Sequence, residues 1–152
     1  MRGILVRLAI IAIVALGAFV LRDRLSGSAS DLAVGDCFDI PEAETVQDVQ
    51  HQPCTDAHDA EVVYVGDHPA PDGTAPLSDE GLQTFVMTTC GGAMLEYVGG
   101  LQSLETNAEL QNLDLGVFYP ATEDWTRGER KITCYLRSVD GSQLTKAFKA
   151  AS

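Results

Sequence analysis

The sequence predicts an α+β fold, an antiparallel sheet of about five strands with one main helix packed on it, in the order β-β-β-α-β-β. Short runs with the two-residue alternation of half-buried strands lie on both sides of a single long helical pattern. Four cysteines fall within or beside these elements, and two disulfides are the simplest use of them in an exported domain. An apolar N-terminal segment predicts a single transmembrane helix ahead of the domain.

Residues 4–21 form an apolar run that only Arg7 interrupts. As a helix, a run of this length spans about 27 Å, close to the ~30 Å hydrocarbon core of a bilayer. More positive charge precedes the run than follows it, which by the positive-inside rule places the N-terminus in the cytoplasm. We therefore expect residues 1–24 to anchor the chain in the cell membrane as a single pass, with residues 4–21 in the lipid and everything after Arg24 extracytoplasmic.

A cleaved signal peptide is the alternative to an anchor, and it would release a secreted domain. The small residues 28–30 resemble a cleavage site, but the charged residues 22–24 separate them from the apolar run, which favours an uncleaved anchor. Residues 25–30 then read as a flexible linker of small side chains, and residues 31–152 as one extracytoplasmic domain.

The predicted domain is strongly acidic. Only Asp23 among the 22 acids and four of the 10 bases precede residue 31, so the domain holds 21 acids, six bases and a net charge of −15. No Lys or Arg occurs between Arg24 and Arg127. Such a surface repels phosphate and anionic lipid, so no nucleic-acid partner is expected. No EF-hand spacing accompanies the acids, so neither a metal site nor a cofactor is predicted.

Three strands are predicted in the first half of the domain. Cys37–Ile40 alternates apolar and polar residues and ends before Pro41, which has no N–H to donate to a ladder. Thr45–His51 alternates imperfectly, which allows a bulge. After a turn at Pro53–His58, the β-branched and aromatic run Glu61–Val65 predicts the strongest strand.

A single helix is predicted after the proline-rich loop Asp67–Pro76. Ser78 is a candidate N-cap, two acids follow it, and apolar residues then recur on one face as far as Tyr97. Gly91-Gly92 is unfavourable inside a helix and predicts either a kink or the close approach of another backbone. Gly99-Gly100 is expected to end the helix.

The last third of the chain alternates short segments. Leu101–Asn112 fits either a short helix or a surface loop, and Asp114–Tyr119 fits a strand that Pro120 ends. Residues 122–125 fit a turn or one helical turn, and Glu129–Ser138 alternates well enough to predict another strand. The tail from Leu144 is expected to form a short amphipathic helix.

Two groups of residues carry a resemblance to a known family. They are Gly35-Asp36-Cys37, Val49, Cys54, His58 and Glu61-Val62, followed by Tyr119-Pro120, Trp125, Gly128, Arg130 and Cys134. Over about residues 32–144 this pattern resembles the bacterial septum-formation domain family, small envelope-exposed domains of Gram-positive bacteria that are usually tied to the membrane. Gln52-Pro53 lengthens the first group, and Ala57 stands where the pattern has Pro. The resemblance implies a link to septum formation and cell division.

The four cysteines allow three disulfide pairings. We favour Cys37 with Cys54, which closes a local hairpin-like unit, and Cys90 with Cys134, which ties the apolar helix face to a strand. No C-x-x-C spacing occurs, so neither a redox motif nor a zinc ribbon fits.

His58 and Glu61 lie near other acids, in a cluster that could hold a metal or form an acid–base pair. Their spacing matches neither H-E-x-x-H nor a metal loop, so structural roles are favoured. We expect the His58 imidazole to bond backbone near the first disulfide, and Glu61 to bond Arg130 or a backbone N–H.

Trp125 and Arg130 could form a binding hot spot. Alternatively, Trp125 fills space in the core and Arg130 forms ion pairs with nearby acids, and we favour this structural role. No nucleophile elbow and no phosphate-binding glycine loop is present, so no catalytic residue is predicted.

The sequence thus predicts a non-catalytic, membrane-anchored extracytoplasmic domain. Its expected role is a protein-interaction module of the cell envelope, with envelope or division-site membrane proteins as partners. The alternative is an anchored or secreted sensor of a small ligand or metal, or an enzyme, that uses His58, Glu61 and nearby acids.

Overall fold

The computed structural model of the chain describes residues 26–27, 29–41 and 49–151. Within this part, no helix is both long enough and apolar enough to cross a membrane. The predicted anchor at residues 1–24 lies outside the described residues, as do residues 45–48, the first four residues of the predicted strand Thr45–His51.

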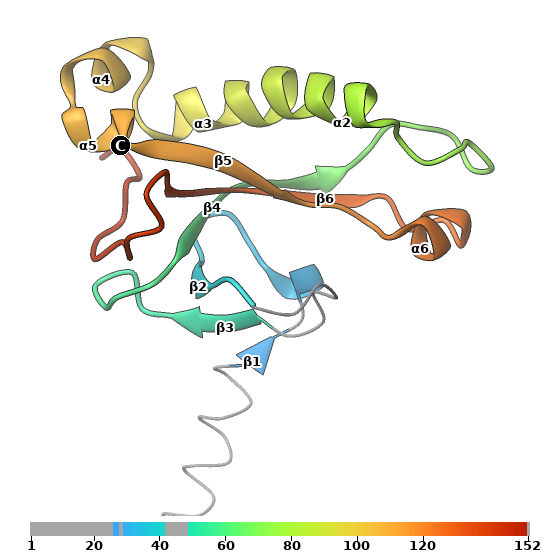
Figure 1. The fold of residues 1–152 in the computed structure, drawn as a ribbon, viewed down its shortest axis with the longest axis horizontal. Coiled ribbons are helices and arrows are strands. Elements are labelled where there is room, and N and C mark those ends of the chain that lie inside the picture. Colours follow the sequence, from blue (N-terminus) through green and yellow to red (C-terminus); the bar gives the residue numbers. More distant parts are fainter. Residues whose placement is uncertain (1–25, 28, 42–48, 152) are drawn as a thin grey trace, which may run out of the picture.

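One antiparallel sheet organises the described residues (Figure 1). The two-residue strand β1 lies within the segment predicted as a linker, and it pairs with β3. The other five strands follow the predicted β-β-β and β-β order around the helix. In space the order is β1-β3-β2-β4-β6-β5, and the strands are β1 (Ser26–Gly27), β2 (Cys37–Asp39), β3 (Val49–Gln52), β4 (Ala60–Asp67), β5 (Leu113–Phe118) and β6 (Lys131–Ser138).

The two longest strands, β4 and β6, form the centre of the sheet. They pair from Ala60 opposite Arg137 to Asp67 opposite Lys131, and the register shifts once, between Val62 and Tyr64. A bulge of this kind changes the face of the sheet toward which the following side chains point. As a result Val63 and Tyr64 both pack toward the helix, whereas Val62 and Val65 belong to the opposite face.

The predicted main helix is present as three continuous segments, α2 (Asp79–Phe85), η2 (Val86–Cys90) and α3 (Gly91–Tyr97) (Figure 1). Ser78 caps it, because its Oγ accepts the Gly81 N–H at 3.1 Å. Of the two alternatives predicted at Gly91-Gly92, a kink or a close backbone approach, the close approach is wrong: a Cβ on Gly92 would meet nothing within 4 Å, and one on Gly91 only the Val86 carbonyl at 3.8 Å. Instead the pair follows η2, a π-helical turn, where the helix is locally widened.

Shorter helices occupy the remaining segments. The ambiguous stretch 101–112 contains two helices, α4 (Leu101–Thr106) and α5 (Ala108–Gln111), and one helical turn, α6 (Thr122–Thr126), precedes β6. A 3₁₀ turn, η1 (Ala29–Asp31), follows β1. The predicted amphipathic helix from Leu144 is wrong, because the tail is irregular and Leu144 forms an isolated antiparallel bridge with His58.

The sheet has a hydrophobic core on each face, and the Cys90–Cys134 disulfide lies in the core beneath the helix. The cluster under the helix contains Cys90, Ile132, Cys134 and Leu136, whereas Phe38, Val62 and Tyr135 are part of the cluster on the other face. Both favoured disulfide pairings are confirmed, with Cα–Cα separations of 5.2 Å for Cys37–Cys54 and 5.8 Å for Cys90–Cys134. Loops of these lengths predict about 3 and about 4 kcal/mol of stabilisation in the chain-entropy account.

Candidate functional site

The four predicted site residues lie at opposite ends of the β4–β6 pair. His58 and Glu61 lie at the start of β4, and Trp125 and Arg130 lie just before the start of β6. Because the strands are antiparallel, these starts are separated by about six strand residues, roughly 20 Å. The structure therefore contains two separate polar clusters, and we name each by the segment it holds.

The tail clamp consists of Glu61, Tyr97, His58 and the backbone of the C-terminal tail. Glu61 is fully buried, and its Oε1 accepts the Tyr97 hydroxyl proton at 2.5 Å. Its Oε2 accepts the backbone N–H of Phe148 at 2.8 Å. Of the two partners expected for Glu61, the backbone N–H is present, and no ion pair with Arg130 forms within the described chain. The carboxylate thus joins the end of α3 to the tail through two neutral donors.

Tyr97 closes the tail clamp from the helix side. Burial raises the pKa of its phenol well above the ordinary value, and the hydrogen bond to Glu61 and the negative charges of Glu61 and Asp36 raise this pKa further. The phenol therefore stays protonated and keeps donating to Glu61 throughout the neutral range. The Tyr97 carbonyl also accepts the N–H of Ala150 at 2.8 Å, which ties α3 to the tail a second time.

His58 holds the tail through its backbone and a neighbouring turn through its ring. Its N–H donates to the Leu144 carbonyl at 3.0 Å, and the Leu144 N–H donates back at 2.7 Å. Nδ1 lies 2.8 Å from the Asp56 carbonyl, which can only accept, so Nδ1 carries the proton in this contact. The ring is fully buried, and Nε2 has no hydrogen-bond partner among the described residues. The imidazole thus bonds backbone near the first disulfide, as predicted.

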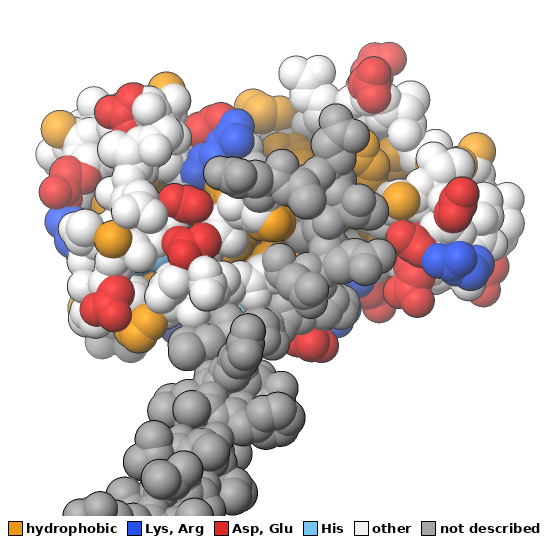
Figure 2. All heavy atoms as spheres, turned by 60° about the horizontal axis from the view of Figure 1, so that its bottom comes forward, with side chains coloured by type: hydrophobic (Ala, Val, Ile, Leu, Met, Phe, Trp, Pro, Cys, Tyr) orange, Lys and Arg blue, Asp and Glu red, His pale blue; other side chains and the backbone are white. Residues whose placement is uncertain are grey.

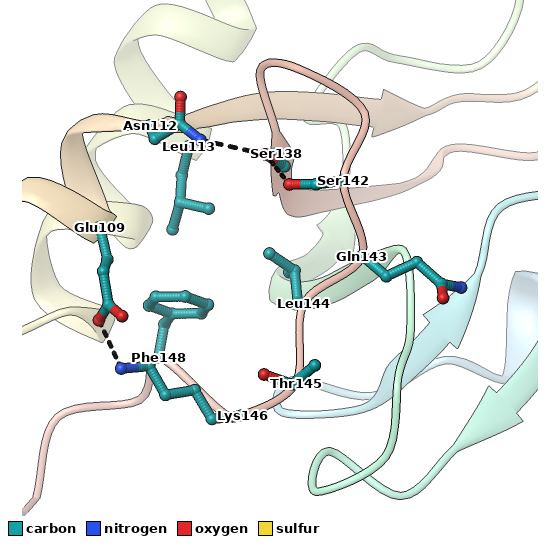
Figure 3. Close-up of a pocket in the computed structure, with 10 residues that line it drawn as sticks. All are labelled: Glu109, Asn112, Leu113, Ser138, Ser142, Gln143, Leu144, Thr145, Lys146 and Phe148. Carbon is teal, nitrogen blue, oxygen red and sulfur yellow. Dashed lines mark hydrogen bonds and ion pairs between the residues drawn. The ribbon is translucent and has the colours of Figure 1, made fainter.

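A shallow hollow of about 170 Å³ lies beside the tail (Figure 3). Leu113, Leu144 and Phe148 point into it, and an exposed ion pair between Lys146 and Glu109 borders it. The polar groups on its upper rim bond one another, since Ser138 Oγ lies within hydrogen-bond distance of Asn112 and Ser142. In the described part of the chain, no three His, Cys, Asp or Glu side chains are arranged to hold a metal ion.

The loop clamp consists of Arg130, Trp125 and His68, which fasten the loop between β4 and α2. The Arg130 side chain is 8 % exposed and donates to four backbone carbonyls. The acceptors are Trp125 at 2.6 Å, Glu129 at 2.9 Å, Ala70 at 3.4 Å and Pro71 at 3.4 Å. This guanidinium is thus satisfied mainly by uncharged oxygen atoms.

Trp125 supplies the apolar part of the loop clamp. Its ring is 1 % exposed and lies 4.3 Å from the Arg130 guanidinium carbon, a cation–π contact. Its Nε1–H donates to the Thr74 carbonyl at 2.9 Å, so the indole also binds the loop. Among the described residues, Asp72 is the one acid within ion-pair distance of Arg130, at 4.0 Å, and its side chain is 96 % exposed, so this ion pair adds little.

His68 packs between two rings of the loop clamp. Its ring centroid lies 5.0 Å from that of Phe85 and 5.5 Å from that of Trp125, and its Nδ1 accepts the Ala70 N–H at 3.1 Å. Burial lowers the pKa of this imidazole, and the positive charge of Arg130 lowers the pKa further. His68 is therefore a neutral acceptor that shapes the loop.

A family model described as septum formation matches residues 34–151. The chain belongs to the septum formation family. No curated protein and no solved structure matches it. This membership links the chain to septum formation, and it covers both clamps together with both disulfides.

Many of the residues that carry the septum formation pattern are buried in this fold, whereas Tyr119 and Gly128 are exposed. Gly35 has a positive φ of 96°, and its N–H donates to the Val62 carbonyl at 2.9 Å, while the Val62 N–H donates to the Asp36 carbonyl at 2.9 Å. These bonds hold Cys37 opposite Glu61 of β4, and Cys37 forms its disulfide with Cys54. The first half of the pattern therefore shapes the start of β4, and the second half, from Trp125 to Arg130, forms the loop clamp.

Several contributors to the clamps, among them Tyr97, His68 and Phe148, were not predicted as site residues. Tyr97 was assigned only to the apolar helix face, although a tyrosine at the end of such a face must find a partner for its hydroxyl. His68 lies in a proline-rich loop with no recognised spacing around it. Phe148 contributes its backbone N–H, and no side-chain pattern could have indicated that contact.

Proposed function

We propose that this septum formation family member is a non-catalytic, membrane-anchored extracytoplasmic domain that binds other proteins of the division site or cell envelope. One observation carries the proposal. The side chains best suited to chemistry, His58, Glu61, Trp125 and Arg130, are buried, and the contacts they make hold backbone segments of the same chain. Their role is architectural, so we assign function to the surface that they shape.

The charge of that surface supports a protein-binding role. Figure 2 shows acidic side chains gathered at both ends of one face, with few basic ones. Three of the domain's cations, Arg127, Arg137 and Lys146, form ion pairs with acids, and Arg130 is buried in the loop clamp. The remaining field is negative, which attracts basic partners and opposes binding to anionic lipid.

The anchor is the second part of the proposal. Residues 1–24 would hold the domain at the outer face of the membrane, and β1 begins at Ser26, almost directly after them. We expect the full chain to sediment with membranes and its C-terminal tail to be cut by protease added to cells stripped of their wall. A variant that lacks residues 4–21 should be neither membrane-bound nor exported, and a mature protein about 3 kDa shorter than the full chain would instead indicate cleavage.

Crosslinking on intact cells tests the interaction. A photoreactive amino acid would replace Met87, Tyr119 or Val139 in turn, since these side chains are 70 %, 51 % and 64 % exposed. We expect recurrent capture of division-site or wall-synthesis membrane proteins from at least one position. Capture of nothing specific, together with metal-dependent thermal stabilisation that is lost in His58→Ala, would reject the proposal and favour a ligand-binding or enzymatic role.

A further inference from the structure

We propose that the free edge of β5 binds an extended, lysine- or arginine-bearing segment of a partner protein as an additional strand. This inference rests on the proposed function as an interaction module and assigns that function to one face. Strand addition relies on unpaired backbone groups at a sheet edge for affinity, and on the alternating side chains of the added strand for specificity.

The hydrogen-bond pattern shows which residues of β5 face outward. Among the described strands, β5 is last in the sheet and pairs only with β6. The N–H of Val139 donates to the Asn112 carbonyl, so in an antiparallel ladder every second residue from Asn112 bonds β6. The N–H of Leu115 agrees with this phase, since it donates to Asp114 Oδ1 at 2.9 Å. Leu113, Leu115 and Val117 therefore direct their backbone groups toward the open side.

The strand is held in place on its other sides, so the edge is preformed. The side chains of Leu113, Leu115 and Val117 pack against the core beneath the helix. On the opposite face Phe118 lies 4.7 Å from Tyr135, centroid to centroid. A partner strand would thus dock on a rigid template and would not have to order it, which reduces the entropic cost of binding.

The two edges of the sheet differ in length and position. The β1 edge is two residues long and directly follows the predicted anchor, whereas β5 has six residues. Four strands separate them in the sheet, which amounts to roughly 24 Å at ~4.8 Å per strand. Figure 1 shows β1 and β5 on opposite sides of the molecule. The long edge therefore faces away from the membrane side and toward incoming partners.

The acidic residues around β5 determine which kind of partner strand is favoured. Residues 101–126 contain five acids, which are Glu105, Glu109, Asp114, Glu123 and Asp124, and no Lys or Arg. The Asp114 side chain lies on the edge strand and is 54 % exposed; its Oδ1 accepts the Leu115 N–H, and its Oδ2 forms an exposed ion pair with Arg137 at 3.4 Å. A basic side chain of a partner would compete with Arg137 for this exposed carboxylate, whereas an acidic strand would be repelled by the surrounding acids. A second copy is disfavoured as occupant, since each domain carries a net charge of −15.

The geometry also predicts the sequence pattern of the partner. Residues of an added strand opposite Leu113, Leu115 and Val117 lie on the helix side of the sheet, beside apolar side chains. The intervening residues lie on the face of Asp114, where a positive charge is favoured. The best-matched segment therefore alternates apolar and basic residues, and a fluorescent peptide of alternating valine and lysine is a suitable probe.

Fluorescence anisotropy with the full chain in neutral detergent micelles tests the proposal. The Val/Lys peptide should bind at least about tenfold more tightly than a Val/Glu peptide of equal length. Val117→Pro removes one outward N–H and leaves the β6 ladder intact, and it should weaken binding about tenfold. Val117→Thr keeps the N–H and should change binding less than about threefold. Asp114→Asn should weaken binding and reduce its salt dependence, without requiring a backbone change.

Several outcomes would overturn the inference. Failure of the Val/Lys peptide to bind, or equal binding by Val117→Pro and Val117→Thr in folded protein, would exclude the β5 edge. Concentration-dependent self-association that Val117→Pro abolishes would make a second copy the occupant. If photocrosslinks from Met87 or Val139 still capture division proteins while a photoreactive residue at position 117 captures none, the proposed function stands and the β5 assignment fails.

Discussion

The tail clamp and the loop clamp each hold an irregular segment against the sheet, the first through the acidic side chain of Glu61 and the second through the basic side chain of Arg130. Each buries an ionisable side chain at one end of the β4–β6 pair and satisfies it with uncharged partners. In the tail clamp, Glu61 accepts from two donors. In the loop clamp, Arg130 donates to four carbonyls and also stacks on Trp125. Both side chains fasten an irregular segment to the sheet, so each works as a tether for backbone.

The clamps differ in how many polar groups lose their hydrogen-bond partner when the central residue, Arg130 or Glu61, is replaced. A missing guanidinium leaves four buried or half-buried carbonyls to find new donors, whereas a missing carboxylate leaves one hydroxyl and one N–H. Because an unsatisfied buried polar group costs about 1–3 kcal/mol, we expect the loop clamp to be the more sensitive of the two.

The largest effect is expected for Arg130→Met, which keeps the length of the side chain and removes its donors. We expect a loss of about 3–5 kcal/mol in the free energy of unfolding. Trp125 is the only tryptophan, so its fluorescence during urea unfolding reports this end of the molecule directly. Arg127→Met is the matched control, since Arg127 is exposed and, among the described residues, forms an ion pair only with Asp124, and it should cost under about 1 kcal/mol. Equal losses in both variants would contradict the architectural role of Arg130.

A smaller effect is expected for Glu61→Leu, about 2–4 kcal/mol, because the Tyr97 hydroxyl and the Phe148 N–H lose their acceptor. Loosening should be greatest in the tail, so trypsin should cleave after Lys146 and Lys149 faster than in the parent protein. Glu109→Gln is the control, because it breaks only the exposed contact with Lys146 and should leave stability within about 1 kcal/mol. If Glu109→Gln released the tail as strongly as Glu61→Leu, the tail clamp would not be what holds it.

The sequence predicted the strands and disulfides better than it predicted the clamps, and the reason is physical. Alternation within Glu129–Ser138 and the apolar face ending at Tyr97 are local patterns, so they place Cys134 and Cys90 on facing elements. The partners of Glu61 are 36 and 87 residues away in the chain, and one of them is a backbone N–H. Backbone acceptors likewise surround Arg130, and side-chain identity does not encode them.

Non-local contacts also account for the errors in predicted secondary structure. The residues from Leu144 onward have a spacing that a short helix could also use, but two backbone bonds to His58 hold this stretch extended. Such non-local pairing overrides weak local preference. At Gly91-Gly92 the sequence showed that something was unusual, and only the structure showed a π-helical turn just before the pair.

The third prediction concerns alkaline pH and the tail clamp. Burial raises the pKa of Tyr97, so the unfolded chain loses this proton near pH 10 while the folded chain keeps it. The corresponding stability is fully present below about pH 10 and is lost as the pH rises above it. Tyr97→Phe should cost about 1 kcal/mol at pH 7 and flatten the decline measured between pH 9 and pH 11. Burial also raises the pKa of Tyr135, so Tyr135→Phe is the control. It should remove only the part of the alkaline stability decline that Tyr135 contributes, and leave the part that comes from Tyr97.

The smallest effect is expected at acid pH and belongs to the loop clamp. Burial and Arg130 lower the pKa of His68, so the unfolded chain binds a proton near pH 6.5 that the folded chain resists. Stability from this residue is present above about pH 6.5 and is lost as the pH falls below it. In His68→Asn the amide oxygen can still accept the Ala70 N–H, so we expect a shallower decline between pH 7 and pH 5 by Trp125 fluorescence. The alkaline decline should be unchanged in this variant, and the acid decline unchanged in Tyr97→Phe. If either variant altered the opposite limb, the two clamps would be coupled through the β4–β6 pair and would no longer count as independent tethers.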